Sequence, residues 1–223
     1  MLDVLLPRRC LVCGAGGALL CGGCRSGLPR LEPPLCDLCG APVAWPVRRC
    51  CECGGRRIAF AVARAAVPYD DAVRRLVAGW KERGLRRLAE EAAALVAERI
   101  ERPDAARVTF VPADRARRLE RGHHPAEQLA RTLAERWRLP AEALLRRTRT
   151  APRQRGLTLR ERRRNAAGAF SAAQGIGGTV VLVDDVYTTG ATASAAAAAL
   201  RAAGAARVEV VTFARTVRSR GYG

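Results

Sequence analysis

Two adjacent aspartates and a hydroxyl-rich loop are the residues of this sequence best suited to do chemistry. Asp184 and Asp185 directly follow an apolar run at 180–183, and a Thr-Thr-Gly-Ala-Thr loop comes three residues later, before an alanine-rich stretch. The N–H groups at the start of a helix lack helical partners, and together with the helix dipole they favour an anion. The loop is therefore predicted to bind phosphate through Thr188, Thr189, Gly190, Ala191 and Thr192.

The acid pair limits which phosphate compound the loop can take. Two carboxylates would repel a bare phosphate, but they are natural acceptors for the hydroxyl groups of a ribose diol. Asp184 and Asp185 are therefore the candidate catalytic residues, predicted to bind the diol of a ribose 5-phosphate and to help hold Mg²⁺. The alternative is a plain buried strand with an aspartate cap, which would not need three threonines at this spacing.

The cysteines indicate a metal-binding module. All nine lie between positions 10 and 53, and eight of them form four Cys-x-x-Cys pairs. Two such pairs make one closed tetrahedral zinc site, which is structural rather than catalytic. We expect two Zn²⁺ ions; sequential pairing of the dyads is simplest, crossed pairing stays open, and Cys51 is left over. The predicted ligands are Cys10, Cys13, Cys21, Cys24, Cys36, Cys39, Cys50 and Cys53.

Two further observations bear on this module. Gly14, Gly40 and Gly54 follow three of the pairs, at positions where a knuckle turn needs a positive φ. Disulfides are the alternative way to stabilise so small a module, but a reducing cytosol would not keep them.

The composition changes near residue 57, which predicts two domains. Residues 1–57 form the cysteine-rich module, and residues 58–223 alternate between strand-like and helical patterns. We expect strands at 58–67, 107–114, 180–183 and 207–214, and helices at 71–83, 85–100, 125–137 and 192–203. This order predicts an α/β fold with a parallel sheet, whose ligands bind beyond the carboxyl ends of its strands.

Charge and hydropathy limit the kinds of partner that we expect for this protein. The formal net charge is +18, and eight thiolates with two Zn²⁺ would reduce it to +14. Such a charge attracts nucleotides, pyrophosphate and nucleic acid, although it also serves as a solubilising surface. No apolar run reaches the roughly 18 residues of a membrane span, and the first ten residues do not resemble a secretory signal. We expect a cytoplasmic protein without membrane insertion.

The stretch VVLVDDVYTTGATA at 180–193 resembles the phosphoribosyl-pyrophosphate (PRPP) motif of type I phosphoribosyltransferases. The chain as a whole resembles the ComF family of ComFC-like competence proteins, in which a cysteine ribbon precedes such a domain. The segments 2–14, 111–122 and 150–170 carry this wider resemblance. One departure stands out: the family continues Arg-Gly with Phe-Asn-Gln, whereas here Gly122 precedes His123, His124 and Pro125.

The resemblance implies a Mg²⁺-dependent phosphoribosyltransferase, a glycosyltransferase acting on PRPP with an acceptor that the sequence does not reveal. It places Ala113, Asp114 and Arg115 on the pyrophosphate side, together with Lys81. The stretch 146–164, which holds nine arginines and one acid, corresponds to the mobile lid. The alternative that the resemblance raises is a non-catalytic adaptor that binds single-stranded DNA alongside DNA-uptake proteins.

Overall fold

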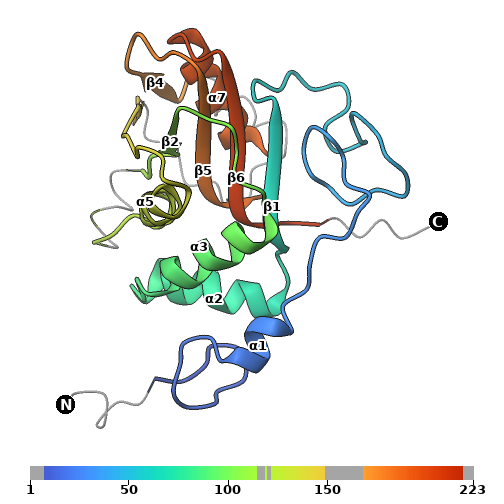
Figure 1. Cartoon of the computed structure of the whole chain (residues 1–223), viewed down its shortest axis with the longest axis vertical. Helices are drawn as coiled ribbons and strands as arrows, with labels where there is room; N and C mark the ends of the chain where they lie inside the picture. Colours follow the sequence, from blue (N-terminus) through green and yellow to red (C-terminus); the bar gives the residue numbers. More distant parts are fainter. Residues whose placement is uncertain (1–7, 115–118, 120–121, 149–167, 218–223) are drawn as a thin grey trace.

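A parallel four-stranded sheet forms the centre of the larger domain. The computed structural model describes residues 8–114, 119, 122–148 and 168–217. The strands are β1 (Val62–Pro68), β2 (Arg107–Phe110), β5 (Thr179–Tyr187) and β6 (Arg207–Arg215), in the order β1-β6-β5-β2 and all parallel (Figure 1). The predicted α/β class with a parallel sheet is confirmed.

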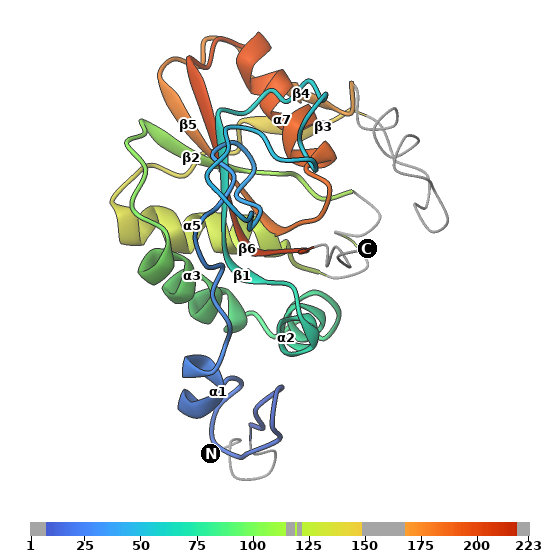
Figure 2. The ribbon, with the colours of Figure 1, turned by 90° about the vertical axis from the view of Figure 1, so that its right-hand side faces the viewer.

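Helices cover both faces of this sheet. Helices α3 (Leu88–Arg99) and α5 (Pro125–Trp137) lie on one face, with α2 (Asp71–Glu82) beside α3, and α7 (Ala191–Ala202) lies on the other (Figure 2). Two short antiparallel strands, β3 (Leu145–Arg147) and β4 (Phe170–Ala172), lie next to α7. Along β5, Val181 and Val183 pack into the core on the α3 side, whereas Val180 and Leu182 pack into the core on the α7 side.

The helix ends follow local chemistry. Asp70 caps α2 by accepting a hydrogen bond from the Val73 N–H at 2.8 Å. Gly84, with φ of +66°, separates α2 from α3 as predicted, but α3 begins at Leu88 rather than at residue 85. Helix α5 has the predicted bounds, with Pro125 in its first turn.

Small side chains dominate the sheet-facing side of α7. Its buried residues are Ala193, Ala196, Ala197 and Leu200, so three of the four contacts with the sheet are made by single methyl groups. Because alanine adds so little thickness, such a face allows a helix to approach its sheet closely.

The cysteine-rich module touches the larger domain at two places. A first loop with the short helix α1 (Gly22–Ser26) lies beside α2 and α3, where Arg25 forms an ion pair with Glu98. A second loop lies beside the edge strand β1, where the Ala63 N–H donates to the Leu38 carbonyl at 2.8 Å (Figure 1). Each loop carries one group of four cysteines.

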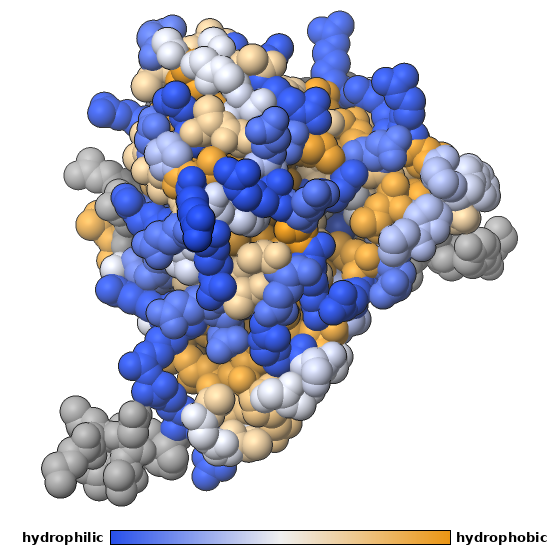
Figure 3. Space-filling model, in the orientation of Figure 1, coloured by the Kyte–Doolittle hydropathy of each residue, from blue (hydrophilic) through white to orange (hydrophobic). Residues whose placement is uncertain are grey.

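The surface is strongly polar. Hydrophilic side chains cover most of the face in Figure 3, with apolar side chains showing between them. Among the described residues, no helix has the length and apolar character needed to span a bilayer.

Candidate functional site

The acid pair lies inside β5, not beyond its end. The apolar run predicted a strand ending at residue 183, but β5 continues to Tyr187 beside β6, and Asp184 is in register with Thr212. The alternation of faces reverses at the acids, because Val186 packs on the α3 side and Tyr187 on the α7 side. The strand is therefore irregular here, and the Asp184 carboxylate accepts a hydrogen bond from the Asp185 N–H at 2.9 Å.

Asp184 is half-buried. Burial raises the pKa of its carboxyl from 3.8 to about 7, the charge of Asp185 acts in the same direction, and Lys81 and Arg147 oppose it. In the ligand-free protein this group therefore takes up a proton near neutral pH. A cation or a hydrogen-bond donor placed beside it would favour the ionised form.

Lys81 contacts the other acid. Its Nζ lies 2.7 Å from Oδ1 of Asp185, and the two side chains are 24% and 14% exposed. Lys81 is in the last turn of α2, so this ion pair joins that helix to the carboxyl end of β5. The lysine predicted for the pyrophosphate side is thus next to the acid pair.

The predicted phosphate loop follows directly. Thr188 is exposed, Thr189 is half-buried, and Gly190 has φ of +70°. Helix α7 begins at Ala191, one residue earlier than predicted, so Ala191 and Thr192 lie in its first turn. The Ala191 N–H donates to Thr189 Oγ1 at 3.3 Å. The N–H groups in the first turn of a helix have no partner within the helix, so here they lie next to the loop.

Two contacts that the sequence did not predict hold this loop. A Cβ atom at Gly190 would lie 2.2 Å from the Tyr187 hydroxyl oxygen, so the ring of Tyr187 requires a glycine above it. Thr216, just after β6, donates its N–H to the Tyr187 carbonyl at 2.9 Å and its hydroxyl to the Thr188 carbonyl at 3.1 Å. The end of β6 therefore fixes where the loop begins.

The loop after β2 lies beside the acids. The Val111 N–H donates to the Val183 carbonyl at 3.0 Å, which aligns this loop with β5. The Ala113 N–H contacts His124 Nε2, and His124 Nδ1 accepts from the Glu127 N–H at 2.9 Å. His124 thus caps α5, which gives the departure from the Phe-Asn-Gln pattern a structural role.

The rest of the predicted pyrophosphate side is only partly described. Asp114 is the last described residue of its loop, and Arg115 lies outside the described residues. Of the predicted lid at 146–164, residues 149–164 also lie outside them. Its described start is in β3, where the Arg147 guanidinium carbon lies 4.9 Å from the centre of the Phe170 ring. Arg147 also lowers the pKa of Asp184, so the start of the predicted lid lies on the side of the acids.

The eight predicted ligands form two groups with sequential pairing, and Cys51 is exposed. A tetrahedral zinc site with Zn–S bonds of about 2.3 Å places its sulfurs about 3.8 Å apart. The Sγ–Sγ distances are 3.7 Å for Cys13–Cys21 and 3.5 Å for Cys39–Cys50. Both groups are therefore consistent with zinc sites, and no disulfide joins any of the nine described cysteines.

The two clusters differ in their surroundings. In the first, Cys13 is exposed and two more cysteines are half-buried, whereas all four cysteines of the second are buried. Gly14 and Gly40 have the predicted positive φ, of +80° and +66°. The prediction for Gly54 was wrong, because the left-handed residue of that turn is Gly55, with φ of +63°.

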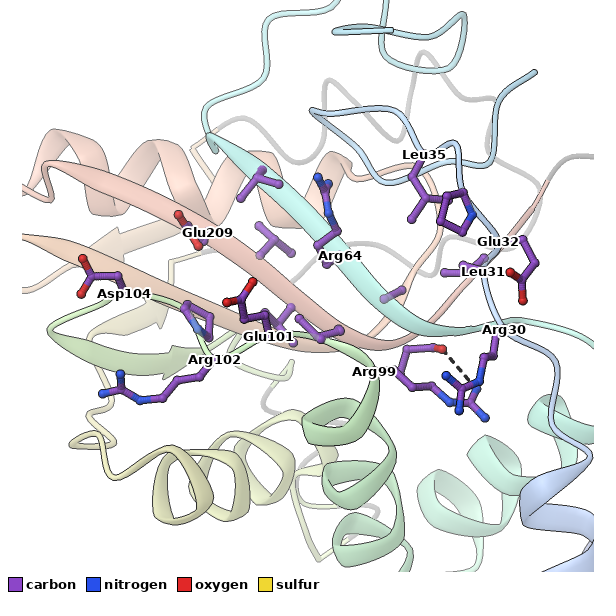
Figure 4. Close-up of a pocket in the computed structure, with 18 residues that line it drawn as sticks. Arg30, Leu31, Glu32, Leu35, Arg64, Arg99, Glu101, Arg102, Asp104 and Glu209 are labelled. Atoms are coloured by element: carbon purple, nitrogen blue, oxygen red, sulfur yellow. Dashed lines mark hydrogen bonds between the residues drawn. The ribbon is translucent and has the colours of Figure 1, made fainter. Parts of the chain in front are cut away.

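A large cavity among the described residues lies away from these sites. It is a groove of about 710 Å³ at the amino ends of β1 and β6, bounded by the segments 30–35 and 99–104 (Figure 4). Its lining mixes both charges, with Arg64, Arg99 and Arg102 near Glu101 and Glu209. None of the predicted site residues lines this groove.

Comparison with protein families agrees with this geometry. A double zinc ribbon domain model matches residues 1–56, and a phosphoribosyl transferase domain model matches residues 57–221. The chain therefore belongs to the phosphoribosyl transferase domain family and carries a double zinc ribbon.

Two relatives match this chain over most of their own length. The chain is 28% identical over 210 residues to competence protein F of Haemophilus influenzae, covering 88% of this chain and 90% of that protein. It is 31% identical over 231 residues to the DNA utilization protein YhgH of Escherichia coli K12, covering 95% and 99%. Among solved structures, a glutamine PRPP amidotransferase of B. subtilis matches 57% of this chain and 26% of its own, with 25% identity and a TM-score of 0.41.

Proposed function

We propose that this protein binds PRPP, or a related ribose phosphate, together with Mg²⁺, and transfers the phosphoribosyl group to an acceptor. The observation that supports this best is the direct succession of an acid pair in β5, a loop with a left-handed Gly190, and the free amino end of α7. The 5-phosphate would bind at residues 188–192, while Asp184 and Asp185 would accept hydrogen bonds from the diol.

The residues around the acids suit the breaking of the anomeric C–O bond. As pyrophosphate leaves, positive charge develops on the ribose ring, and the ionised acid pair would stabilise it. Lys81 would move from Asp185 toward the departing oxygens or be shared with them, since one ammonium group has three donors. Mg²⁺, when bound, supplies charge neutralisation for the pyrophosphate. Catalysis would otherwise consist mainly of positioning.

An acceptor screen tests the catalytic proposal. Pyrophosphate release from PRPP is measured with bases, amines and single-stranded DNA as acceptors, and the variant Asp184→Asn/Asp185→Asn serves as the matched control. We expect at least one acceptor class to release pyrophosphate in the native protein and not in the variant. Equal release by both proteins, or equal PRPP affinity by calorimetry, contradicts the assignment of the acid pair.

A second candidate function is binding of single-stranded DNA as an adaptor of DNA uptake. It is favoured by the net charge of +18 and by relatives whose names refer to competence and DNA utilization. Phosphate contacts by arginine make such binding weaken steeply with salt. Titration of a labelled oligonucleotide at several salt concentrations tests this, and an affinity that hardly changes with salt rules it out.

A further inference from the structure

Arg215 is a buried cation between the second cysteine cluster and the phosphate loop. It is the last residue of β6, its side chain is 1% exposed, and it lies beside Tyr187 in the sheet register. A guanidinium group so far from water needs its donors satisfied by fixed partners. The partners of Arg215 therefore show what this side chain holds in place.

Nε of Arg215 donates to the Thr216 carbonyl at 3.4 Å, and the other two partners belong to the second cysteine loop. Arg215 Nη1 donates to the carbonyl oxygen of Cys39 at 2.5 Å, and Nη2 lies 2.9 Å from the Glu52 carboxylate. Cys39 is a predicted zinc ligand, and Glu52 lies one residue before another, Cys53. The guanidinium thus joins the two halves of the cluster, which are separated by more than ten residues of chain.

Arg215 also contacts Tyr187, the residue just before the predicted phosphate loop. Its guanidinium carbon lies 5.2 Å from the centre of the Tyr187 ring, and the Tyr187 hydroxyl lies directly under Gly190. Thr216, the next residue, holds the Tyr187 and Thr188 carbonyls. A displacement of Arg215 would therefore move both the ring that supports Gly190 and the backbone at which the loop begins.

The loop of the first cluster has no hydrogen bond or ion pair with residues 187–190 among the described residues; it lies nearer to the other end of the site, through α2, which carries Lys81. It contacts α2 and α3, through Leu11 against Gly79 and through the ion pair of Arg25 with Glu98. The second cluster, in contrast, packs in the same hydrophobic core as Tyr187 and the buried alanines of α7. The two clusters are chemically alike but differ in what they touch, so each serves as the control for the other.

We propose that Arg215 is a positioning residue that couples metal loading of the Cys36, Cys39, Cys50 and Cys53 cluster to phosphate binding at residues 188–192. The proposal rests on the proposed function only in that these residues bind a phosphate group. The metal fixes the Cys39 carbonyl, Arg215 fixes Tyr187, and Tyr187 fixes Gly190. The coupling is absent from the first cluster.

Reciprocal linkage gives a test that a merely structural role would not pass. If zinc in the second cluster raises the affinity for a phosphate ligand, that ligand raises the zinc affinity by the same factor. Cys13→Ser disables the first cluster and Cys53→Ser disables the second. In each full-length variant, the zinc affinity of the intact cluster is measured by competition with a chelator, with and without ribose 5-phosphate.

We expect ribose 5-phosphate to raise the zinc affinity of the second cluster about fivefold or more and to leave that of the first unchanged. Adding Arg215→Met to Cys13→Ser should abolish the effect while zinc still binds. Glu52→Gln, which keeps the bond to Cys39, should reduce the effect and provides a milder variant if Arg215→Met does not fold.

Three results overturn the proposal. If ribose 5-phosphate binds but changes both clusters equally or neither, the coupling is wrong and the proposed function stands. The same holds if the effect persists in both Arg215→Met and Glu52→Gln. If the unmodified protein does not bind ribose 5-phosphate by calorimetry, the phosphate site and the coupling both fail.

Discussion

Lys81 at the end of α2 and Asp185 within β5 form an ion pair of 2.7 Å, and this pair joins the only lysine of the chain to the candidate site. The lysine is thus one of two cations, with Arg147, that act on the acid pair. Its ammonium group lowers the pKa of the neighbouring Asp184 carboxyl, so Lys81 also influences the pH at which Asp184 ionises.

Replacing this lysine should change the pH dependence of ligand binding. Lys81→Met removes the charge that lowers the pKa of Asp184, so that carboxyl should ionise at a higher pH than in the native protein. We expect the pH midpoint of PRPP binding to move upward and the affinity at pH 7 to fall about tenfold, or about 1.4 kcal/mol. Calorimetry between pH 6 and pH 9 measures both, and Lys81→Arg, which keeps the charge, should restore most of the midpoint.

The raised pKa of Asp184 also predicts how stability varies with pH. Between the ordinary pKa of 3.8 and about 7, the folded protein holds this proton more tightly than the unfolded chain, so its contribution to stability falls as the pH rises through this window. Asp184→Asn should therefore be stabilised relative to the native protein at pH 8, by on the order of a few kcal/mol, and by less than half as much at pH 5. Urea unfolding at both pH values measures this, with the exposed Asp104→Asn as the control for the substitution itself. A difference that does not depend on pH contradicts the assignment.

Two glycine variants separate the cost of a left-handed backbone from the cost of a steric clash in the predicted phosphate loop. Gly190 and Gly175 have φ of +70° and +77°, but a Cβ at Gly175 would meet nothing within 4 Å, whereas one at Gly190 would overlap Tyr187. Gly175→Ala should cost about 1–2 kcal/mol for the left-handed backbone alone. Gly190→Ala should cost roughly 1–3 kcal/mol more and should weaken phosphate binding at least tenfold. Thermal unfolding and calorimetry with ribose 5-phosphate report the two effects, and equal behaviour of the two variants refutes the role of Tyr187.

Serine variants of three cysteines test the metal clusters. The native protein should contain two zinc ions per chain, and Cys51→Ser should keep both, because Cys51 belongs to neither cluster. Cys13→Ser and Cys53→Ser should each lower the zinc content toward one. Cys53→Ser should lower the melting temperature more, because its side chain is fully buried within the core shared with α7. Elemental analysis and calorimetry measure these changes; loss of both zinc ions from either variant contradicts independent clusters.

Short-range patterns in the sequence were enough to predict the α/β class, the parallel sheet and the cysteine clusters. The Cys-x-x-Cys spacing predicted both clusters, because a knuckle is a local structure whose ligands lie within about fifteen residues of one another. The end of β5 was misplaced for an equally physical reason. Its apolar run stops at residue 183, but β6 continues to Arg215 and supplies partners for three more residues of the strand.

The contacts that hold the site together could not be predicted. Arg215 and Glu52 are separated by 163 positions, and nothing in the local sequence of either residue indicates the other. Tyr187 lies within the recognised motif, yet its role under Gly190 follows only from the reversal of strand faces at the acid pair. Long-range pairings of single side chains leave no periodic signal, so they appear only once the chain is folded.

The alanine stripe on α7 has a consequence for how this protein can vary. The height of a helix that packs on a sheet through methyl groups is set by those small side chains, and a close-packed core leaves little room for a larger one. A larger side chain at Ala196 or Ala197 would push α7, and the loop before it, away from β5, the strand that carries the acid pair. The spacing between the acid pair and the predicted phosphate loop thus depends on side chains of a single methyl group, at positions where sequence drift would otherwise look harmless.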